Sequence, residues 1–270
     1  MRTIVHLSDL HFGRVNHQLI APLIKSVEDI KPDLIAISGD LTQRARSHEF
    51  QAAREFLNQL PQPQIVVPGN HDVPLHNVFT RFLQPLEKYQ RYITSDLEPS
   101  FADDEIAVVG MNTARSFTIK GGRINYRQVA RIRDKFCVLP DEITKVVVTH
   151  HPFDLPENYG DRDLVGRARM AMTGLAECGA DVFLAGHLHV MHTGHTATRY
   201  KIRGHSALVV QAGTASSTRG RGEANSFNIV RLNHPQISVE RAMWQQESAS
   251  FVTSAVAENF RHTHEGWVRE

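Results

Sequence analysis

Short apolar runs rich in β-branched residues alternate with amphipathic stretches along the first 190 residues of the chain. The runs predict strands at 3–7, 34–38, 65–67, 106–110, 145–149 and 182–185. Apolar positions at helical spacing predict helices around 19–27, 50–60, 126–137 and 168–178, and a proline-interrupted helical region at 76–92. This alternation is typical of βαβ units, so we expect an α/β fold with a mainly parallel sheet.

The pattern changes after residue 190, where helical periodicity fades. Runs at 195–202, 207–212, 226–232 and 236–244 predict four strands of a more antiparallel sheet, with a clear turn at Asn233-His234-Pro235. The tail from about residue 245 gives no prediction. Because no linker or repeat interrupts the chain, we expect one domain over 1–270, with the candidate site at 9–189 and C-terminal strands and tail at 190–270.

Composition narrows the class of protein only slightly. The 270 residues are 41% hydrophobic and carry a formal net charge of +1, which suits one well-buried core. This balance gives no general attraction to nucleic acid, so a nucleic-acid partner is possible but not favoured. No apolar run approaches the roughly 20 residues that span a bilayer, and the first residues lack the features of a signal peptide.

The chain has two cysteines, Cys137 and Cys178, and both fall in predicted helices. We therefore expect buried thiols, neither a disulfide nor a metal site. Together with the absence of a signal peptide, this favours the cytoplasm.

Five of the predicted strands run directly into clusters of polar residues. In chain order the clusters are Asp9-Leu10-His11, Gly39-Asp40-Leu41-Thr42, Gly69-Asn70-His71-Asp72, His150-His151-Pro152 and Gly186-His187-Leu188-His189. Ligand crevices of open α/β sheets lie outside the carboxyl ends of the strands, so the clusters should converge on one rim. A single cluster of this kind is more often a cap or turn, but five in order indicate a site.

The clusters supply carboxylates, imidazoles and an amide, a mixed set that suits Mn, Fe, Zn or Co better than Ca or Mg alone. Glycines before Asp40, Asn70 and His187 allow tight turns and close backbone approach. We interpret the adjacent pair His150-His151 as one ligand and one packing residue.

This ordered series of motifs resembles the calcineurin-like metallophosphoesterases. Asp-Leu-His-Phe-Gly at 9–13 with Thr-His-His-Pro at 149–152 further resembles the bacterial class III cyclic-nucleotide phosphodiesterase branch. The resemblance implies a four-layer α/β/β/α sandwich of two mixed sheets flanked by helices, and two divalent or mixed-valence metal ions per chain. It implies one metal held by Asp9, His11, Asp40 and His189, and a second held by Asp40, Asn70, His150 and His187.

The expected reaction is hydrolysis of a small phosphodiester, such as a 3′,5′-cyclic nucleotide. Two metals about 3.5–4 Å apart can clamp a phosphoryl group and hold the attacking hydroxide. His71, directly after Asn70, is the expected general acid for the leaving oxygen. The alternatives are a pyrophosphatase similar to UDP-diacylglucosamine hydrolase, a nuclease, and an inactive metal-binding interaction module.

Two sequence differences separate this chain from other branches of the family that it resembles. Gly-Asp-Leu-Thr-Gln-Arg at 39–44 differs from the longer signature of serine/threonine protein phosphatases. No tyrosine lies close after Asp40 in the sequence, so the coloured Fe(III) centre of purple acid phosphatases is not expected.

Further residues are candidates for contact with substrate. Arg14, Arg115 and Arg219, with Arg221 in the same loop, could bind phosphate, although a solvated surface charge explains each equally well. Asp72 could orient His71 or cap the next element. Within the helical region at 76–92, an apolar entrance for a lipid substrate or ordinary core packing would both explain Val78, Phe79, Phe82, Leu83 and Leu86. The resemblance also suggests a homodimer formed through the C-terminal strands.

Overall fold

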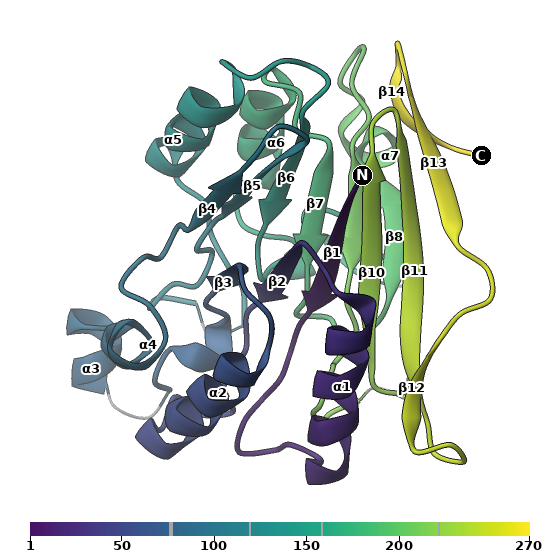
Figure 1. Cartoon of the computed structure of the whole chain (residues 1–270). Coiled ribbons are helices and arrows are strands. Elements are labelled where there is room, and N and C mark those ends of the chain that lie inside the picture. The colour runs from purple at the N-terminus through teal and green to yellow at the C-terminus, as the bar shows by residue number, and fades with distance from the viewer. Residues whose placement is uncertain (76–77, 119, 158, 221) are drawn as a thin grey trace.

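Two mixed β-sheets pack face to face with helices on their outer faces (Figure 1). The computed structural model describes residues 1–75, 78–118, 120–157, 159–220 and 222–270. This arrangement confirms the α/β/β/α sandwich implied by the resemblance. The expectation of one mainly parallel sheet followed by an antiparallel one was wrong, because the first strands are divided between both sheets.

The first sheet has the order β14-β13-β11-β10-β1-β2-β3, with β12 also paired to β11. Its parallel part consists of β1 (Arg2–Leu7), β2 (Leu34–Ser38) and β3 (Gln64–Val67). Its antiparallel part consists of β10 (Ser226–Asn233), β11 (Gln236–Gln245), β12 (Ser250–Thr253), β13 (Glu258–Thr263) and β14 (Gly266–Arg269). β10 lies antiparallel to β1, so the C-terminal strands extend the sheet that the N-terminus begins.

The second sheet has the order β4-β5-β6-β7-β9-β8. Its centre is parallel and contains β5 (Ile106–Gly110), β6 (Thr144–Val148), β7 (Val182–Ala185) and β9 (Leu208–Gln211). Its antiparallel edges are β4 (Ser100–Ala102) and β8 (His192–His195). Because the central strands are buried on both faces, they carry continuous apolar runs.

Helices cover the outer face of each sheet. α1 (Ile20–Ile30) and α2 (Ser47–Gln59) lie on the first sheet, and α5 (Tyr126–Phe136) and α6 (Ala168–Ala176) on the second (Figure 1). The shorter helices are α3 (Val78–Leu83), α4 (Glu87–Tyr92) and α7 (Thr196–Tyr200), with 3-10 turns at His17–Leu19, Asn70–Asp72 and Asp161–Asp163. One apolar core fills the space between the sheets, and one lies under each helical layer.

The strand predictions hold except at 195–202, where the prediction was wrong. β8 ends at His195 and α7 begins at Thr196. Tertiary contacts override the local pattern, because Thr196 Oγ1 accepts a bond from the Ala207 amide and the Tyr200 hydroxyl donates to the Phe153 carbonyl. The turn at 233–235 joins β10 to β11 as expected, and the tail from 245 contributes β12, β13 and β14.

The prediction of free thiols was also wrong. Cys137 directly follows α5 and Cys178 lies two residues beyond α6, and a disulfide joins them. The two helices pack side by side, which brings their carboxyl ends together. The cytoplasmic expectation had rested partly on free thiols and stays a prediction. Among the described residues, no helix combines the length and apolarity needed to cross a membrane.

Candidate metal centre

The polar clusters of all five strands meet at the edge where the two sheets face each other. Asp9 and His11 follow β1, Asp40 follows β2, and Asn70 and His71 follow β3. From the second sheet, His150 follows β6, and His187 and His189 follow β7. The prediction of one shared rim is therefore confirmed, although the rim is built from two sheets.

An unusual backbone conformation recurs at this rim. Asp9, His11, Asp40, His187 and His189 have φ values of 53°, 48°, 52°, 74° and 59°. The left-handed region costs a non-glycine residue about 1–2 kcal/mol, and such strain is concentrated at functional sites. These turns aim five side chains at one small volume.

The glycines of the rim are required for close approach. Gly39 has a φ of 87°, and a Cβ there would lie 2.8 Å from both the Gly69 nitrogen and His150 Nδ1. A Cβ at Gly186 would overlap the Ser8 hydroxyl. Only glycine at these positions lets the strand ends approach this closely.

One set of donor atoms gathers around Asp9. Its Oδ1 lies 3.5 Å from His11 Nε2 and 3.3 Å from His189 Nε2. The two imidazole nitrogens are 3.4 Å apart, and His11 Nε2 is 3.7 Å from Asp40 Oδ2. All four side chains are buried.

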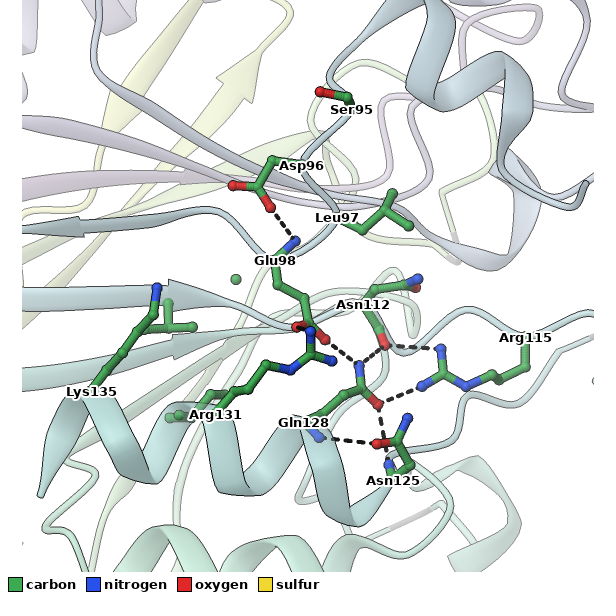
Figure 2. Close-up of a pocket in the computed structure, with 13 residues that line it drawn as sticks. Ser95, Asp96, Leu97, Glu98, Asn112, Arg115, Asn125, Gln128, Arg131 and Lys135 are labelled. Carbon is green, nitrogen blue, oxygen red and sulfur yellow. Dashed lines mark hydrogen bonds and ion pairs between the residues drawn. The ribbon is translucent and has the colours of Figure 1, made fainter.

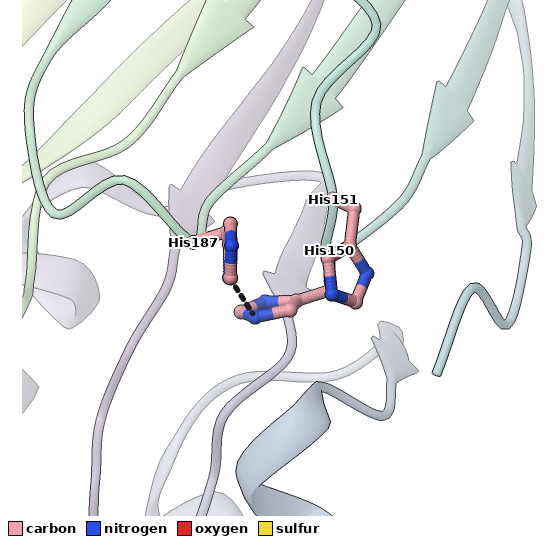
Figure 3. A group of neighbouring side chains, drawn as sticks. All are labelled: His150, His151 and His187. Carbon is pink, nitrogen blue, oxygen red and sulfur yellow. Dashed lines mark hydrogen bonds between the residues drawn. The ribbon is translucent and has the colours of Figure 1, made fainter. Parts of the chain in front are cut away.

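A second set gathers on the other side of Asp40. Asp40 Oδ2 lies 3.3 Å from His150 Nε2, which is 3.1 Å from Asn70 Oδ1. His187 Nδ1 lies 3.3 Å from the same His150 nitrogen (Figure 3). Asp40 Oδ2 is thus common to both sets.

These spacings fit metal ions. Bonds of about 2.0–2.2 Å from nitrogen or oxygen to a metal place neighbouring ligand atoms roughly 3.0–3.5 Å apart. Asp9 Oδ1 is buried and accepts no hydrogen bond within the described residues. Such crowding of buried acceptor atoms is costly unless a cation or a proton lies between them. The two sets could hold two metal ions, with Asp40 shared.

Outer hydrogen bonds fix which atom of each side chain faces the site. Ser8 Oγ and the His187 amide donate to Asp9 Oδ2, at 2.7 and 3.0 Å. The His71 amide donates to Asp40 Oδ1 at 2.8 Å, and His150 Nδ1 donates to the Ser38 carbonyl at 2.8 Å. Asp9 Oδ1, Asp40 Oδ2 and His150 Nε2 are therefore left to face the metal positions.

The electrostatics of the site favour ionised carboxylates. Burial acts to raise the pKa of Asp40, but His150 and the neighbouring histidines hold this pKa well below its usual range. Burial acts to lower the pKa of His150, and the Asp40 charge outweighs it and raises the pKa to about 9. A metal cation bound between these donor atoms would take the place of this proton, because the imidazole must be deprotonated to act as a ligand.

His151 has a different role from His150. Its Nδ1 bonds Thr113 Oγ1 at 2.8 Å and its Nε2 donates to the Lys120 carbonyl at 3.0 Å. Its ring packs against His187 at 4.6 Å between centroids (Figure 3). Both ring nitrogens are engaged, which agrees with its interpretation as the packing member of the pair.

His71 lies at the edge of the metal centre, where its two ring nitrogens have different partners. Nδ1 donates to the Gln43 carbonyl at 2.8 Å, and Nε2 accepts from the Arg219 guanidinium at 2.9 Å. Burial lowers the pKa of His71, so the ring is neutral in this arrangement. Both residues line a pocket of about 290 Å³, the rim pocket, together with Gln43, Arg44, Leu75 and Lys120.

A family model described as calcineurin-like phosphoesterase matches residues 2–191. The chain belongs to this family.

Curated relatives of this phosphoesterase are bacterial. Glycerophosphodiester phosphodiesterase GpdQ of Enterobacter lignolyticus is 33% identical over 94 residues, which is 31% of this chain and 33% of the relative. A probable GpdQ of Arcobacter nitrofigilis is 25% identical over 185 residues, 62% of this chain and 64% of the relative. The 3′,5′-cyclic adenosine monophosphate phosphodiesterase CpdA of Escherichia coli is 23% identical over 201 residues, 69% of each chain. The chain spans a third of the length of the first relative and 64% of the second. The names GpdQ and CpdA support membership of the class III branch.

Solved structures share the phosphoesterase fold. A dimetal phosphatase from Danio rerio aligns with a TM-score of 0.64 at 12% identity, over 93% of this chain and 98% of that one. The purple acid phosphatase PPD1 of yellow lupin aligns with a TM-score of 0.67 at 11% identity, over 90% of this chain and 51% of that one. At these identities the likeness concerns the fold alone.

Asp72 supports the phosphoesterase site from behind. Its carboxylate accepts bonds from the amides of Leu41, Thr42 and Gly69, at 3.2, 2.9 and 2.9 Å. It thus caps the turn at 70–72 and ties this turn to the loop that carries Asp40. The observed contacts show neither proposed role as stated: the carboxylate bonds the backbone and not the His71 ring, and the turn that it caps is its own and not the next element.

The structure brings one of the predicted arginines to the site. Arg219 reaches His71, whereas the side chain of Arg14 is exposed and its carbonyl accepts from the Thr218 amide. Arg115 bonds Asn112, Ala114 and Gln128 in a separate pocket of about 600 Å³ (Figure 2). Arg221 lies outside the described residues.

Sequence reasoning missed two cations of the rim pocket, Arg44 and Lys120. The position of Arg44, four residues after Asp40, was a signal that could have been used. Lys120 offered no such signal, because its loop carries none of the motifs.

Proposed function

We propose that this chain is a metal-dependent phosphodiesterase that hydrolyses a small diester, such as a 3′,5′-cyclic nucleotide. The observation that carries the proposal is the pair of donor sets that share Asp40 Oδ2, within 3.7 Å of His11 Nε2 and 3.3 Å of His150 Nε2. Asp9, His11, Asp40 and His189 would hold one ion, and Asp40, Asn70, His150 and His187 the other. Mn, Fe, Zn or Co suits this mixture of nitrogen and oxygen donors.

Two bound ions would supply Lewis-acid stabilisation of the phosphoryl oxygens and a nucleophilic water near neutral pH. The chain's own residues add charge and proton transfer. Arg219 would donate to a phosphate oxygen from the rim pocket, where its guanidinium already lies beside His71. The bond from His71 Nδ1 to the Gln43 carbonyl leaves Nε2 facing the site. When Arg219 turns from Nε2 to a phosphate oxygen, Nε2 would be free to take up a proton and then give it to the leaving oxygen.

The diester class is supported by the relatives, since GpdQ and CpdA are both named as phosphodiesterases. A rim pocket of about 290 Å³ lies at the lower end of small-molecule sites and favours a compact substrate. A lipid-linked pyrophosphatase and a nuclease remain alternatives within the same chemistry. We also propose that 1–270 functions as one domain, supported by the pairing of β10 with β1. A cytoplasmic location and a homodimer stay predictions.

A panel of substrates on metal-reconstituted protein tests the proposal. We expect hydrolysis of bis(p-nitrophenyl) phosphate and of a cyclic nucleotide, lost after chelation and restored by added metal. The panel also includes a monoester, a UDP-linked lipid and short DNA. If no diester is hydrolysed with any of the four metals, the proposal is contradicted and an interaction module is favoured.

His71→Ala tests the proton donor. We expect turnover of diesters with poor leaving groups to fall by roughly 10²–10⁴-fold, with metal content retained. Diesters with a p-nitrophenolate leaving group should be affected far less. Equal losses on both kinds of diester would contradict the general-acid role.

A further inference from the structure

Five large apolar side chains are exposed together beside the rim pocket. Leu75, Phe79, Phe82, Leu83 and Phe117 are exposed to 43%, 79%, 47%, 73% and 89%. We call this surface the α3 patch. Single exposed apolar side chains are ordinary, but a group of them on neighbouring segments often marks a binding surface in soluble proteins.

The patch has two components that meet. Phe79, Phe82 and Leu83 are spaced i, i+3 and i+4 on α3, so they share one face of the helix. The Phe82 ring lies 5.1 Å from the ring of Phe117, which belongs to the loop after β5. Leu86, three residues beyond α3, is buried in the core, whereas Phe79 and Leu83 of α3 remain exposed.

Arg81 fixes the patch in place. Its guanidinium is buried and donates to the carbonyls of Pro74, Ser116 and Thr118, at 3.0, 2.7 and 2.8 Å. These bonds tie α3 to the loop that carries Phe117. A buried arginine is costly to desolvate, and three carbonyl partners offset that cost. The carbonyls of Pro74, Ser116 and Thr118 are therefore hydrogen-bonded within the fold.

The patch continues into the proposed catalytic site. Leu75 belongs to the patch and also lines the rim pocket with His71 and Arg219. Lys120, three residues after Phe117, lines the same pocket. α3 lies at the end of the molecule where β1 and β6 terminate (Figure 1). Because Leu75 is common to both, a ligand with its phosphate in the pocket could place one ester arm against this surface.

We propose that the α3 patch binds an apolar alkyl or acyl arm of the phosphodiester substrate, so that the natural substrate is amphiphilic. This inference rests on the proposed function and specifies its substrate class. Charge and polarity both match such a ligand, because Arg44, Lys120 and Arg219 surround the phosphate position while the neighbouring surface is apolar.

A chain-length series of alkyl p-nitrophenyl phosphates tests the inference. Methyl, butyl and hexyl diesters share one leaving group, so kcat/KM compares the alkyl arm alone, at concentrations where each is monomeric. Full burial of a methylene would raise kcat/KM about fourfold, and we expect about twofold per methylene on this open surface. The Phe82→Ser/Phe117→Ser variant should flatten the dependence, and Val256→Ser, an exposed valine between β12 and β13, should keep it.

The slope of log kcat/KM against chain length compares substrates within one protein. A variant that loses activity equally on all three diesters therefore keeps the same slope. Should the double variant fail to fold, Phe117→Ser alone serves, because that ring is exposed to 89%. No hydrolysis of any diester would contradict the proposed function itself. Hydrolysis with a flat slope in the unmodified protein would overturn only the patch inference. The unmodified protein could be a dimer that becomes a monomer in the variant while the slope stays unchanged. That result would show that the patch binds a second copy of the chain, and it would also overturn the inference.

Discussion

The guanidinium of Arg219 donates a 2.9 Å hydrogen bond to Nε2 of His71. This contact connects a loop of the C-terminal region with the turn after β3, across 148 positions of the chain. It also places a cation beside Nε2, which must be released from this bond and take up a proton before it could donate one to a leaving oxygen. The functional importance of Arg219 is therefore a direct test of the proposed site.

Arg219→Met should lower kcat/KM for diesters by roughly 10–100-fold, since a hydrogen bond to a charged group contributes about 1.5–3 kcal/mol. Metal content should not change, because Arg219 is outside both donor sets. The matched control is Arg261→Met, an exposed arginine of β13. Equal activity of the two variants would remove Arg219 from the site.

Asp40→Ala should remove metal and activity together, because both donor sets depend on Asp40 Oδ2. Elemental analysis of the purified variant measures metal per chain. Asp29→Ala, which removes an exposed carboxylate paired with Lys25, is the control and should retain metal. A variant of Asp40 that keeps two ions per chain would refute the shared ligand.

Asp72→Ala should weaken metal binding without removing a donor. The amides of Leu41, Thr42 and Gly69 would lose their acceptor, and the loop that carries Asp40 would lose its anchor. Loss of an outer support of this kind costs about 10–100-fold in metal affinity or activity. Competition with a chelator gives the dissociation constant, and an unchanged constant would show that Asp72 only caps its own turn.

Asp181 should make stability depend on pH. Burial raises its pKa to about 6, although the Lys145 amide and Trp267 Nε1 donate to it. The folded chain therefore holds this proton more tightly than the unfolded chain, whose value is near 3.8. The contribution to the free energy of unfolding is fully present below pH 3.8 and is lost as the pH rises through 6, by at most about 3 kcal/mol.

Denaturant unfolding of the native chain and of Asp181→Asn across this pH range measures the effect. The asparagine has no proton to lose, so its penalty is constant. The stability of the native chain relative to the variant should fall between pH 4 and pH 7. A difference that does not change with pH would contradict the buried, raised pKa.

The disulfide between Cys137 and Cys178 should stabilise the fold. It closes a loop across a sequence separation of 41 residues, for which restriction of the unfolded chain gives up to roughly 4 kcal/mol. Reduction should lower the midpoint of unfolding in the native chain. The Cys137→Ala/Cys178→Ala variant should have the lower midpoint with or without reductant, and a native chain insensitive to reductant would contradict the prediction.

The sequence predicted the rim well because each cluster directly follows a strand, and this local relation fixes where the side chain emerges. It did not predict the sheet to which a strand belongs, because β2 and β6 are both five-residue strands buried along their whole length. The disulfide was not predicted for the same reason, since no local signal in the sequence shows that α5 and α6 lie side by side. Of the arginines, only the tertiary fold distinguishes Arg219 at His71 from Arg115, which bonds Gln128.

Five residues of the rim have a left-handed backbone, which lowers the stability of the folded chain: Asp9, His11, Asp40, His187 and His189. Glycine at any of these positions would remove the backbone strain there, but it would also remove a donor atom of the site. Selection for a stable chain and selection for hydrolysis therefore oppose each other at the same five positions. In descendants released from the need for catalysis, mutational drift should begin at this rim, while the apolar strands behind it stay unchanged.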